Sequence, residues 1–127
     1  GELSVDFPGS SLGRQLATVA RVIRSRELVE AERDAFFCSI GGFDSHGNWF
    51  STISSKFSEI NAAVNAFVDE MKQAGVWDNV LIMQASEFGR TMESNGMGFD
   101  HGWGGMHWMA GGRVNGGKFL GKYPESL

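Results

Sequence analysis

The sequence predicts one domain of the α/β class, built from a partial parallel or mixed sheet with flanking helices. Two observations predict it. Residues 35–43 and residues 79–85 are short apolar runs typical of strands buried on both faces, and an amphipathic helix separates them. The order strand, helix, strand favours a parallel pair joined by a right-handed crossover. The length of 127 residues suits a single domain.

Two helices are predicted from apolar residues that repeat at spacings of three and four. In residues 10–26 the apolar stripe consists of Leu12, Leu16, Val19, Ala20 and Ile23. In residues 54–74 it consists of Phe57, Ile60, Val64, Phe67, Val68 and Met71. Ser10 or Ser11 would cap the first helix, Ser54 or Ser55 would cap the second, and Gly75 would end the second.

Residues 89–117 form a glycine-rich stretch without periodicity, which we interpret as a site loop. The chain has 18 glycines, most of them after residue 88, and a structureless stretch of this length is usually functional or disordered. Residues 113–123 predict a hairpin, because their Asn-Gly pair is a strong turn signal. Cys38 is expected to be an inert core residue, and the remaining bulky residues of the loop are expected to pack within it: Trp103, Met106, Trp108 and Met109.

The composition excludes several function classes. The formal net charge is −4, whereas a domain that grips nucleic acid through its phosphates is usually basic, so no nucleic-acid partner is expected. No run approaches the roughly 18–20 apolar residues of a membrane helix, so no membrane span is expected. A single cysteine excludes an internal disulfide and a zinc knuckle built from several cysteines.

Acidic and imidazole side chains follow the two predicted strands and recur in the glycine-rich loop. Asp44 and His46 come after the first predicted strand, and Glu87 comes after the second. Asp100, His101 and His107 follow in the loop. If the strands are parallel, the first three residues emerge at the same carboxyl edge, where open α/β sheets hold their ligands. These donors suit zinc, manganese or iron, so the six residues are candidate ligands of a divalent metal.

Each candidate also has a structural interpretation. Asp44-Ser45-His46 is commonly a turn in which the aspartate bonds backbone amides, and Asp100-His101-Gly102 is commonly a loop turn with a solvated imidazole. Glu87 would then pair with Arg90 in a salt bridge. In the functional interpretation, Arg90 instead holds an anionic group of the substrate by a bidentate contact.

Four motifs together resemble the DUF1501 family, a family of unknown function that is similar to the alkaline phosphatase and sulfatase superfamily. They are Phe43-Asp44-Ser45-His46, residues 80–91, Asp100-His101-Gly102 and residues 111–117, and residues 12–16 extend the resemblance. Family members are much longer, so the resemblance implies that this chain is an alkaline-phosphatase-like C-terminal fragment. Many members carry a twin-arginine export signal, which implies an exported parent protein, periplasmic or extracellular.

The resemblance implies part of a metal-dependent hydrolase that cleaves phosphate or sulfate esters, with a small anionic ester as substrate and zinc or manganese as cofactor. Asp44 and His46 match the superfamily's first ligand motif, and Asp100-His101 or His107 matches its late loop histidine. Ser86-Glu87 stands where an Asp-His pair is usual, which makes Glu87 a ligand or a group that orients a histidine. The superfamily's nucleophile lies in the N-terminal half, so the isolated fragment is expected to be inactive.

Two further interpretations remain open. In the first, the chain is a non-catalytic binding or structural module on the same scaffold, which the glutamate at position 87 favours. In the second, the fragment forms a homodimer, because a sheet cut from a larger domain leaves edges and apolar faces that a second copy would cover.

Overall fold

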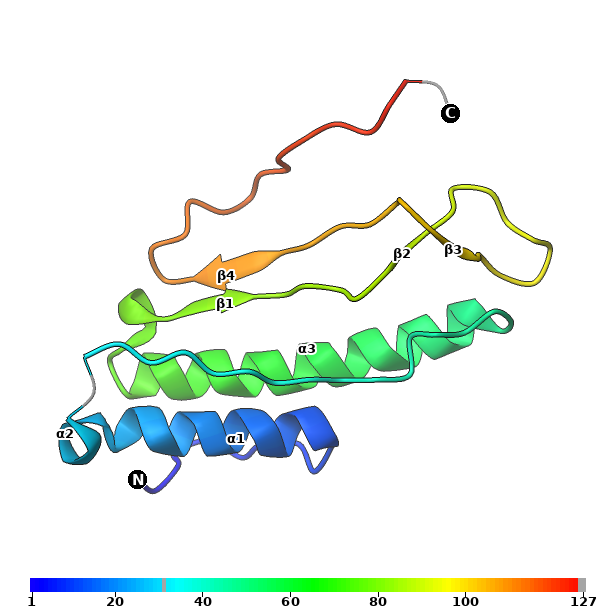
Figure 1. The fold of residues 1–127 in the computed structure, drawn as a ribbon. Coiled ribbons are helices and arrows are strands. Elements are labelled where there is room, and N and C mark those ends of the chain that lie inside the picture. The colour runs from blue at the N-terminus through cyan, green and yellow to red at the C-terminus, as the bar shows by residue number, and fades with distance from the viewer. Residues whose placement is uncertain (31, 126–127) are drawn as a thin grey trace.

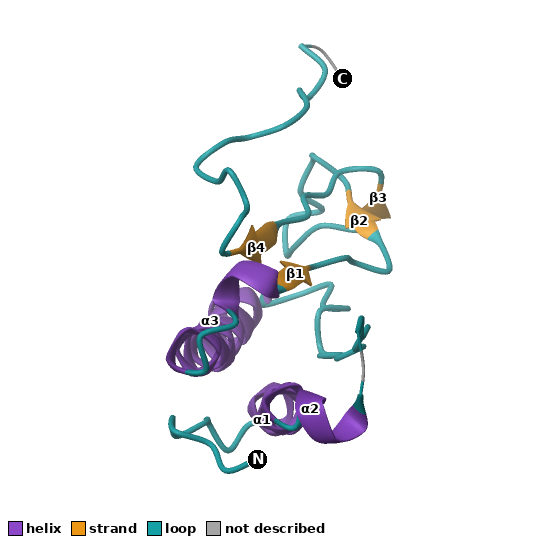
Figure 2. Cartoon of the chain, turned by 90° about the vertical axis from the view of Figure 1, so that its left-hand side faces the viewer, coloured by secondary structure: helices purple, strands orange, loops and turns teal. Residues whose placement is uncertain are grey.

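The computed structural model describes residues 1–30 and 32–125, which form a small domain of helices and short antiparallel sheets (Figure 1). Helix α3 (Trp49–Gln73) lies between α1 (Ser11–Arg24) and the strand pair β1 (Leu81–Met83) and β4 (Met109–Gly111) (Figure 2). The short helix α2 (Arg26–Val29) follows α1, and a 3-10 turn, η1 (Trp77–Asn79), leads into β1. A second strand pair, β2 (Gly89–Arg90) and β3 (His101–Gly102), lies beyond the end of the first pair.

Helix α1 confirms the predicted stripe and cap. The Ser10 hydroxyl accepts a hydrogen bond from the Gly13 N–H at 3.1 Å, which satisfies one of the free amides of the first turn. Leu12, Leu16 and Ala20 are buried against α3 and supply three of the seven buried residues of the main core. The helix ends at Arg24 rather than at residue 26, because the chain bends at Ser25 before α2.

Helix α3 ends where the sequence predicts but begins earlier. Gly75 follows its end in the left-handed conformation, with φ of 69°, as expected for a helix stop. Its first residue is Trp49, five residues before the predicted start at residue 54, so the predicted serine cap is wrong. Residues 49–53 contain aromatic and β-branched residues, which favour helix only weakly, and here tertiary packing overrides that preference. The longer helix brings its N-terminus to within three residues of His46.

Residues 35–43 do not form the predicted strand. The segment is extended, but no backbone ladder joins it to another strand within the described residues. Its hydrogen bonds go to a side chain instead: the Ser39 N–H donates to the Gln15 amide oxygen at 2.9 Å, and the Gln15 amide nitrogen donates to the Ser39 carbonyl at 2.8 Å. The segment therefore lies along the helices, with the partly buried Cys38 against the core, and the expected parallel pair does not form.

The predicted strand over residues 79–85 is present as the shorter β1, and the glycine-rich stretch supplies the other three strands. In β1 and β4, Ile82 pairs with Ala110, and in β2 and β3, Arg90 pairs with His101, both antiparallel. A Cβ atom on Gly102 would lie 2.7 Å from the Thr91 nitrogen, so only glycine allows this approach. The prediction of a structureless loop over residues 89–117 is wrong where β2, β3 and β4 form. Its bulky residues are also more exposed than expected: Trp103 59%, Met106 65%, Trp108 38% and Met109 51%.

The predicted hairpin over residues 113–123 is absent from the described part of the chain. These residues form a turn and then an extended stretch that leads away from the helices. Phe119 is 89% exposed, so no apolar face is available to stabilise a pair of strands here. Among the described residues, no helix is both long and apolar enough to cross a lipid bilayer.

The N-terminal lead-in is held by a buried ion pair between the two long helices. Glu70 of α3 is fully buried, and its Oε1 lies 2.6 Å from a guanidinium nitrogen of Arg24 in α1. Its Oε2 accepts the backbone N–H groups of Ser4 and Val5, each at 2.8 Å. Both carboxylate oxygens are therefore hydrogen-bonded, which offsets the cost of burying the charge.

Candidate metal centre

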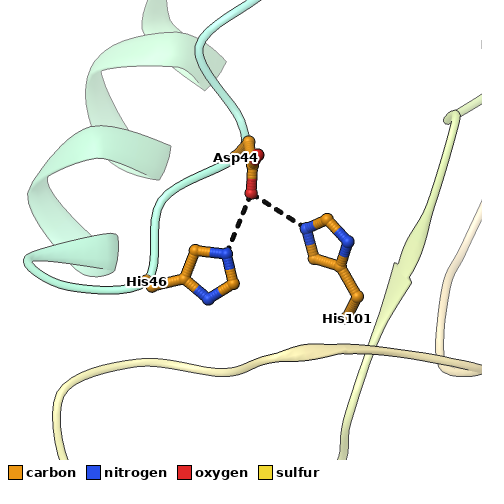
Figure 3. Close-up of side chains that lie close together, drawn as sticks. All are labelled: Asp44, His46 and His101. Carbon is orange, nitrogen blue, oxygen red and sulfur yellow. Dashed lines mark hydrogen bonds and ion pairs between the residues drawn. The ribbon is translucent and has the colours of Figure 1, made fainter.

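Asp44, His46 and His101 meet at one point on the surface (Figure 3). The Asp44 Oδ1 lies 3.1 Å from Nε2 of His46 and 2.9 Å from Nε2 of His101. The three ligand atoms lie within 4.8 Å of one another, and the two imidazoles point toward the same carboxylate oxygen. The predicted convergence of these three residues is therefore present.

Different elements supply the three side chains. Asp44 ends the extended segment that Gln15 holds, and His46 lies just before α3. His101 is the first residue of β3, which the β2 pairing places beside them. The meeting point is thus a helix N-terminus and a short antiparallel pair, not the carboxyl edge of a parallel sheet. The interpretation of Asp100-His101-Gly102 as a loop turn is wrong, because His101 belongs to a paired strand.

His46 contacts a carboxylate on each side. Its Nδ1 lies 3.1 Å from Asp100 Oδ1, and its Nε2 faces Asp44. An ionised carboxylate only accepts, so in this contact Nδ1 of His46 is the donor to Asp100, while Nε2 lies on the side of Asp44, where it can serve as a metal ligand in the Nδ1–H tautomer. Asp100 thus holds the position of the carboxylate that usually orients a metal-bound histidine.

His101 is oriented by aromatic rings. The Phe88 ring stacks on it with centroids 4.0 Å apart and planes inclined by 14°. The His46 ring is also stacked on it, at 5.3 Å and 25°. Stacking fixes the plane of the imidazole and leaves its nitrogens free for other partners.

Both carboxylates of the centre favour the charged form. The hydrogen bond to His101 is the main cause that lowers the pKa of Asp44, with the nearby His46 adding to it. The hydrogen bond to His46 lowers the pKa of Asp100, and a second one from Asn95 adds to it. Neither side chain is enclosed, so both stay ionised at neutral pH and can receive a cation.

Glu87 and His107 lie outside this group. Both line a pocket of about 190 Å³ together with Ser86, Phe88 and Trp103. Neither belongs to the ligand cluster found among the described residues. No ion pair joins Glu87 to Arg90 in the described chain, so the predicted salt bridge does not form. Phe88 lines this pocket and also stacks on His101, which places the pocket next to the centre.

Arg90 is partly buried, and its guanidinium group donates to backbone carbonyls. One terminal nitrogen donates to the Phe43 carbonyl at 2.5 Å, and the other donates to the Phe99 carbonyl. A guanidinium group has five N–H bonds, so some remain for an anion. Its substrate-binding role stays a prediction.

The sequence analysis missed two supporting residues. Asn95 accepts the N–H groups of Met97 and Gly98 and donates to Asp100 Oδ1 at 3.1 Å. The Asn95-Gly96 pair is a turn signal that could have been recognised. Phe88 had no such signal, because only the folded chain shows that it stacks on an imidazole.

A comparison with protein families matches residues 7–126 to the family described as Protein of unknown function (DUF1501). The chain belongs to the DUF1501 family. This match confirms the resemblance that the motifs predicted. Comparisons with curated proteins and with solved structures gave no match. The similarity of DUF1501 to the alkaline phosphatase and sulfatase superfamily stays an expectation.

The donor set of this DUF1501 chain suits a transition metal. With zinc–ligand distances near 2.0–2.1 Å in a tetrahedron, neighbouring donor atoms lie roughly 3.3 Å apart. The two distances from Asp44 Oδ1, 3.1 and 2.9 Å, are close to that spacing. Two imidazoles and one carboxylate are also the three-ligand pattern of catalytic zinc and of non-haem iron, while manganese prefers more oxygen ligands.

Proposed function

We propose that this DUF1501 chain holds a divalent metal ion, zinc or manganese, through Asp44, His46 and His101. The observation that carries the proposal is the Asp44 oxygen facing two imidazole nitrogens at 3.1 and 2.9 Å. Asp100 can receive the Nδ1 proton of His46, which would leave Nε2 of His46 to bind a metal ion. A metal ion at this point would be bound by all three groups and would take the place of the protons that join them.

We further propose that the metal serves the hydrolysis of phosphate or sulfate esters in the parent protein. When bound, a divalent ion would polarise an ester oxygen and stabilise the charge that develops in an in-line displacement. Three protein ligands leave a coordination position for substrate or water, which is the pattern of catalytic rather than structural zinc sites. Asp100 keeps the His46 lone pair directed at the centre, and the free N–H bonds of Arg90 would hold a small anionic ester.

Several predictions belong to this proposal as its finer parts. They are a relationship to the alkaline phosphatase and sulfatase superfamily with its parallel or mixed sheet, an exported parent protein, and a homodimer. Glu87 and His107 offer a carboxylate and an imidazole in the pocket that Phe88 shares with the centre. We propose that they contact the substrate or a further ion there.

Metal content tests the centre directly. Purified wild-type chain, His46→Ala, His101→Ala and Asp69→Ala are incubated with zinc, manganese and ferrous iron in turn, dialysed, and measured by elemental analysis. Asp69→Ala is the control, since it removes an exposed potential ligand in α3, outside the cluster. We expect one metal ion in the wild type and the control and a strong loss in the other two variants, with zinc retained best. Equal metal content in all four proteins would refute the proposal.

One observation favours a non-catalytic binding or structural module instead. The side chains of Asp44, His46 and His101 are 63%, 54% and 46% exposed, whereas catalytic centres usually lie in clefts that exclude water. The metal-loaded parent protein, assayed with aryl phosphate and aryl sulfate esters, separates the two functions. Metal-dependent turnover that His46→Ala abolishes supports the hydrolase, and metal binding without any turnover supports the module.

A further inference from the structure

We propose that Arg90 is a positioning residue of the metal centre, one that holds the two ligand-bearing segments in register through their backbone carbonyls. This inference rests on the proposed metal site, and it assigns Arg90 a structural task there in addition to any contact with substrate. It follows from the guanidinium contacts, the strand pairing around them, and the sign of the charge.

The two carbonyls to which Arg90 donates belong to the residues just before the carboxylates Asp44 and Asp100. Phe43 precedes Asp44, and Phe99 precedes Asp100. These segments are far apart in the chain, and no strand ladder joins them within the described residues. A single planar group with both terminal nitrogens occupied therefore fixes the separation of the two backbones, and with it the separation of the ligands.

Backbone hydrogen bonds anchor Arg90 itself to the strand that carries His101. Its N–H donates to the Gly104 carbonyl at 2.7 Å, and its carbonyl accepts the Gly104 N–H at 2.9 Å. The next residue, Thr91, donates its N–H to the Asp100 carbonyl at 2.9 Å. The arginine side chain thus reaches the Asp44 segment from a backbone that is already fixed relative to Asp100 and His101.

The guanidinium group also supports the ring that orients His101. Its central carbon lies 5.2 Å from the centroid of the Phe88 ring, within the range of a cation–π contact. The same ring stacks on the His101 imidazole. Arg90 therefore acts on both ligand-bearing segments through two carbonyls, and on the orientation of His101 through one aromatic ring.

The sign of the charge separates positioning from electrostatics. A fixed positive charge beside a cation site opposes metal binding, so removing that charge alone would strengthen binding. A positioning role predicts the opposite, weaker metal binding, because without the two-pronged guanidinium group the two segments move apart. Lysine keeps the charge but offers one ammonium group in place of a planar fork, so it cannot hold two carbonyls in the same geometry.

The test measures the zinc dissociation constant of the whole chain by competition with a chromophoric chelator. The proteins are wild type, Arg90→Lys, Arg90→Met and the control Arg14→Lys, in which an exposed arginine that also donates to a backbone carbonyl, that of Gly9, is changed. We expect both Arg90 variants to bind zinc about 10–100-fold more weakly, as for other groups that orient ligands. The control should bind like the wild type.

Three results judge the inference. An Arg90→Met variant that binds zinc as tightly as the wild type or more tightly, or an Arg90→Lys variant with wild-type affinity, would overturn it. Cobalt spectra of Arg90→Lys should also show altered d–d bands, which a purely anion-binding role would not change. Circular dichroism checks that each variant is folded. If Arg90→Met is unfolded, the zinc affinity of Arg90→Lys alone decides the test.

A failure of the metal proposal itself is distinguishable. If wild type binds zinc no better than His46→Ala, the proposed function fails. Hydrogen exchange of the metal-free chain then tests the positioning role of Arg90 by itself. Faster exchange at residues 44–46 and 100–101 in Arg90→Lys than in wild type supports the positioning role, and unchanged exchange overturns it.

Discussion

Asp100→Asn isolates the contribution of the carboxylate behind His46. The substitution keeps the size of the side chain and an oxygen that can accept from His46 Nδ1 at the present 3.1 Å. It removes the negative charge that makes the imidazole a stronger ligand. Groups in this position typically contribute 10–100-fold to metal affinity. Because the Asp100 side chain is 58% exposed and competes with water, we expect the lower end, a zinc dissociation constant raised about tenfold.

The assay is the same chelator competition, with Asp69→Asn as the matched control. Asp69 is exposed near the far end of α3, and at 1.5 Å per residue it lies roughly 30 Å along the helix from Trp49. The control carries the same change of charge without touching the centre. If both variants lower the zinc affinity equally, the effect is one of net charge, and the role assigned to Asp100 is refuted. Wild-type affinity in Asp100→Asn would refute it as well.

Three further predictions concern stability and geometry. Glu70→Gln breaks a buried ion pair and should lower the free energy of unfolding in urea by about 3 kcal/mol, and an unchanged midpoint would contradict the burial of its charge. Gly102→Ala should cost about 1–3 kcal/mol and weaken zinc binding, while Gly116→Ala, which meets open space, should do neither. The lowered pKa values of Asp44 and Asp100 mean that their stabilising contribution is present above about pH 4 and is lost as pH falls through the lower folded values. With chelator present, acid unfolding followed by circular dichroism should therefore be shallower in the double asparagine variant than in wild type, and identical curves would exclude this contribution.

Local patterns predicted the helices well, because a helix is closed by hydrogen bonds among its own residues. The stripe of α1 and the Gly75 stop of α3 needed no knowledge of the rest of the chain. Of the two predicted strands, residues 79–85 contain β1 but residues 35–43 form none, because a strand exists only through a partner elsewhere. Residues 35–43 have the composition of a strand, yet the Gln15 side chain takes the backbone groups that a neighbouring strand would pair with.

The same reason explains which candidate ligands meet. The sequence analysis named Asp44, His46, Asp100 and His101, and these four lie together. It also named Glu87 on the assumption of a parallel sheet edge. In the antiparallel arrangement β2 pairs with β3, and it is Phe88 rather than Glu87 that contacts His101. Residue types indicated the chemistry, while the choice among them depended on strand direction.

The two histidines are held by different forces, and this difference gives the centre a defined order of sensitivity. His46 depends on the charge of Asp100, which salt screens at an exposed position. His101 depends on stacking against Phe88, which salt does not screen. Arg90 links the two supports, since it bonds the Phe99 carbonyl next to Asp100 and also covers the Phe88 ring. Loss of Arg90 should therefore weaken metal binding by both histidines together, whereas loss of Asp100 or of Phe88 should weaken binding by only one of them. For this reason the arginine is the most informative single position to change.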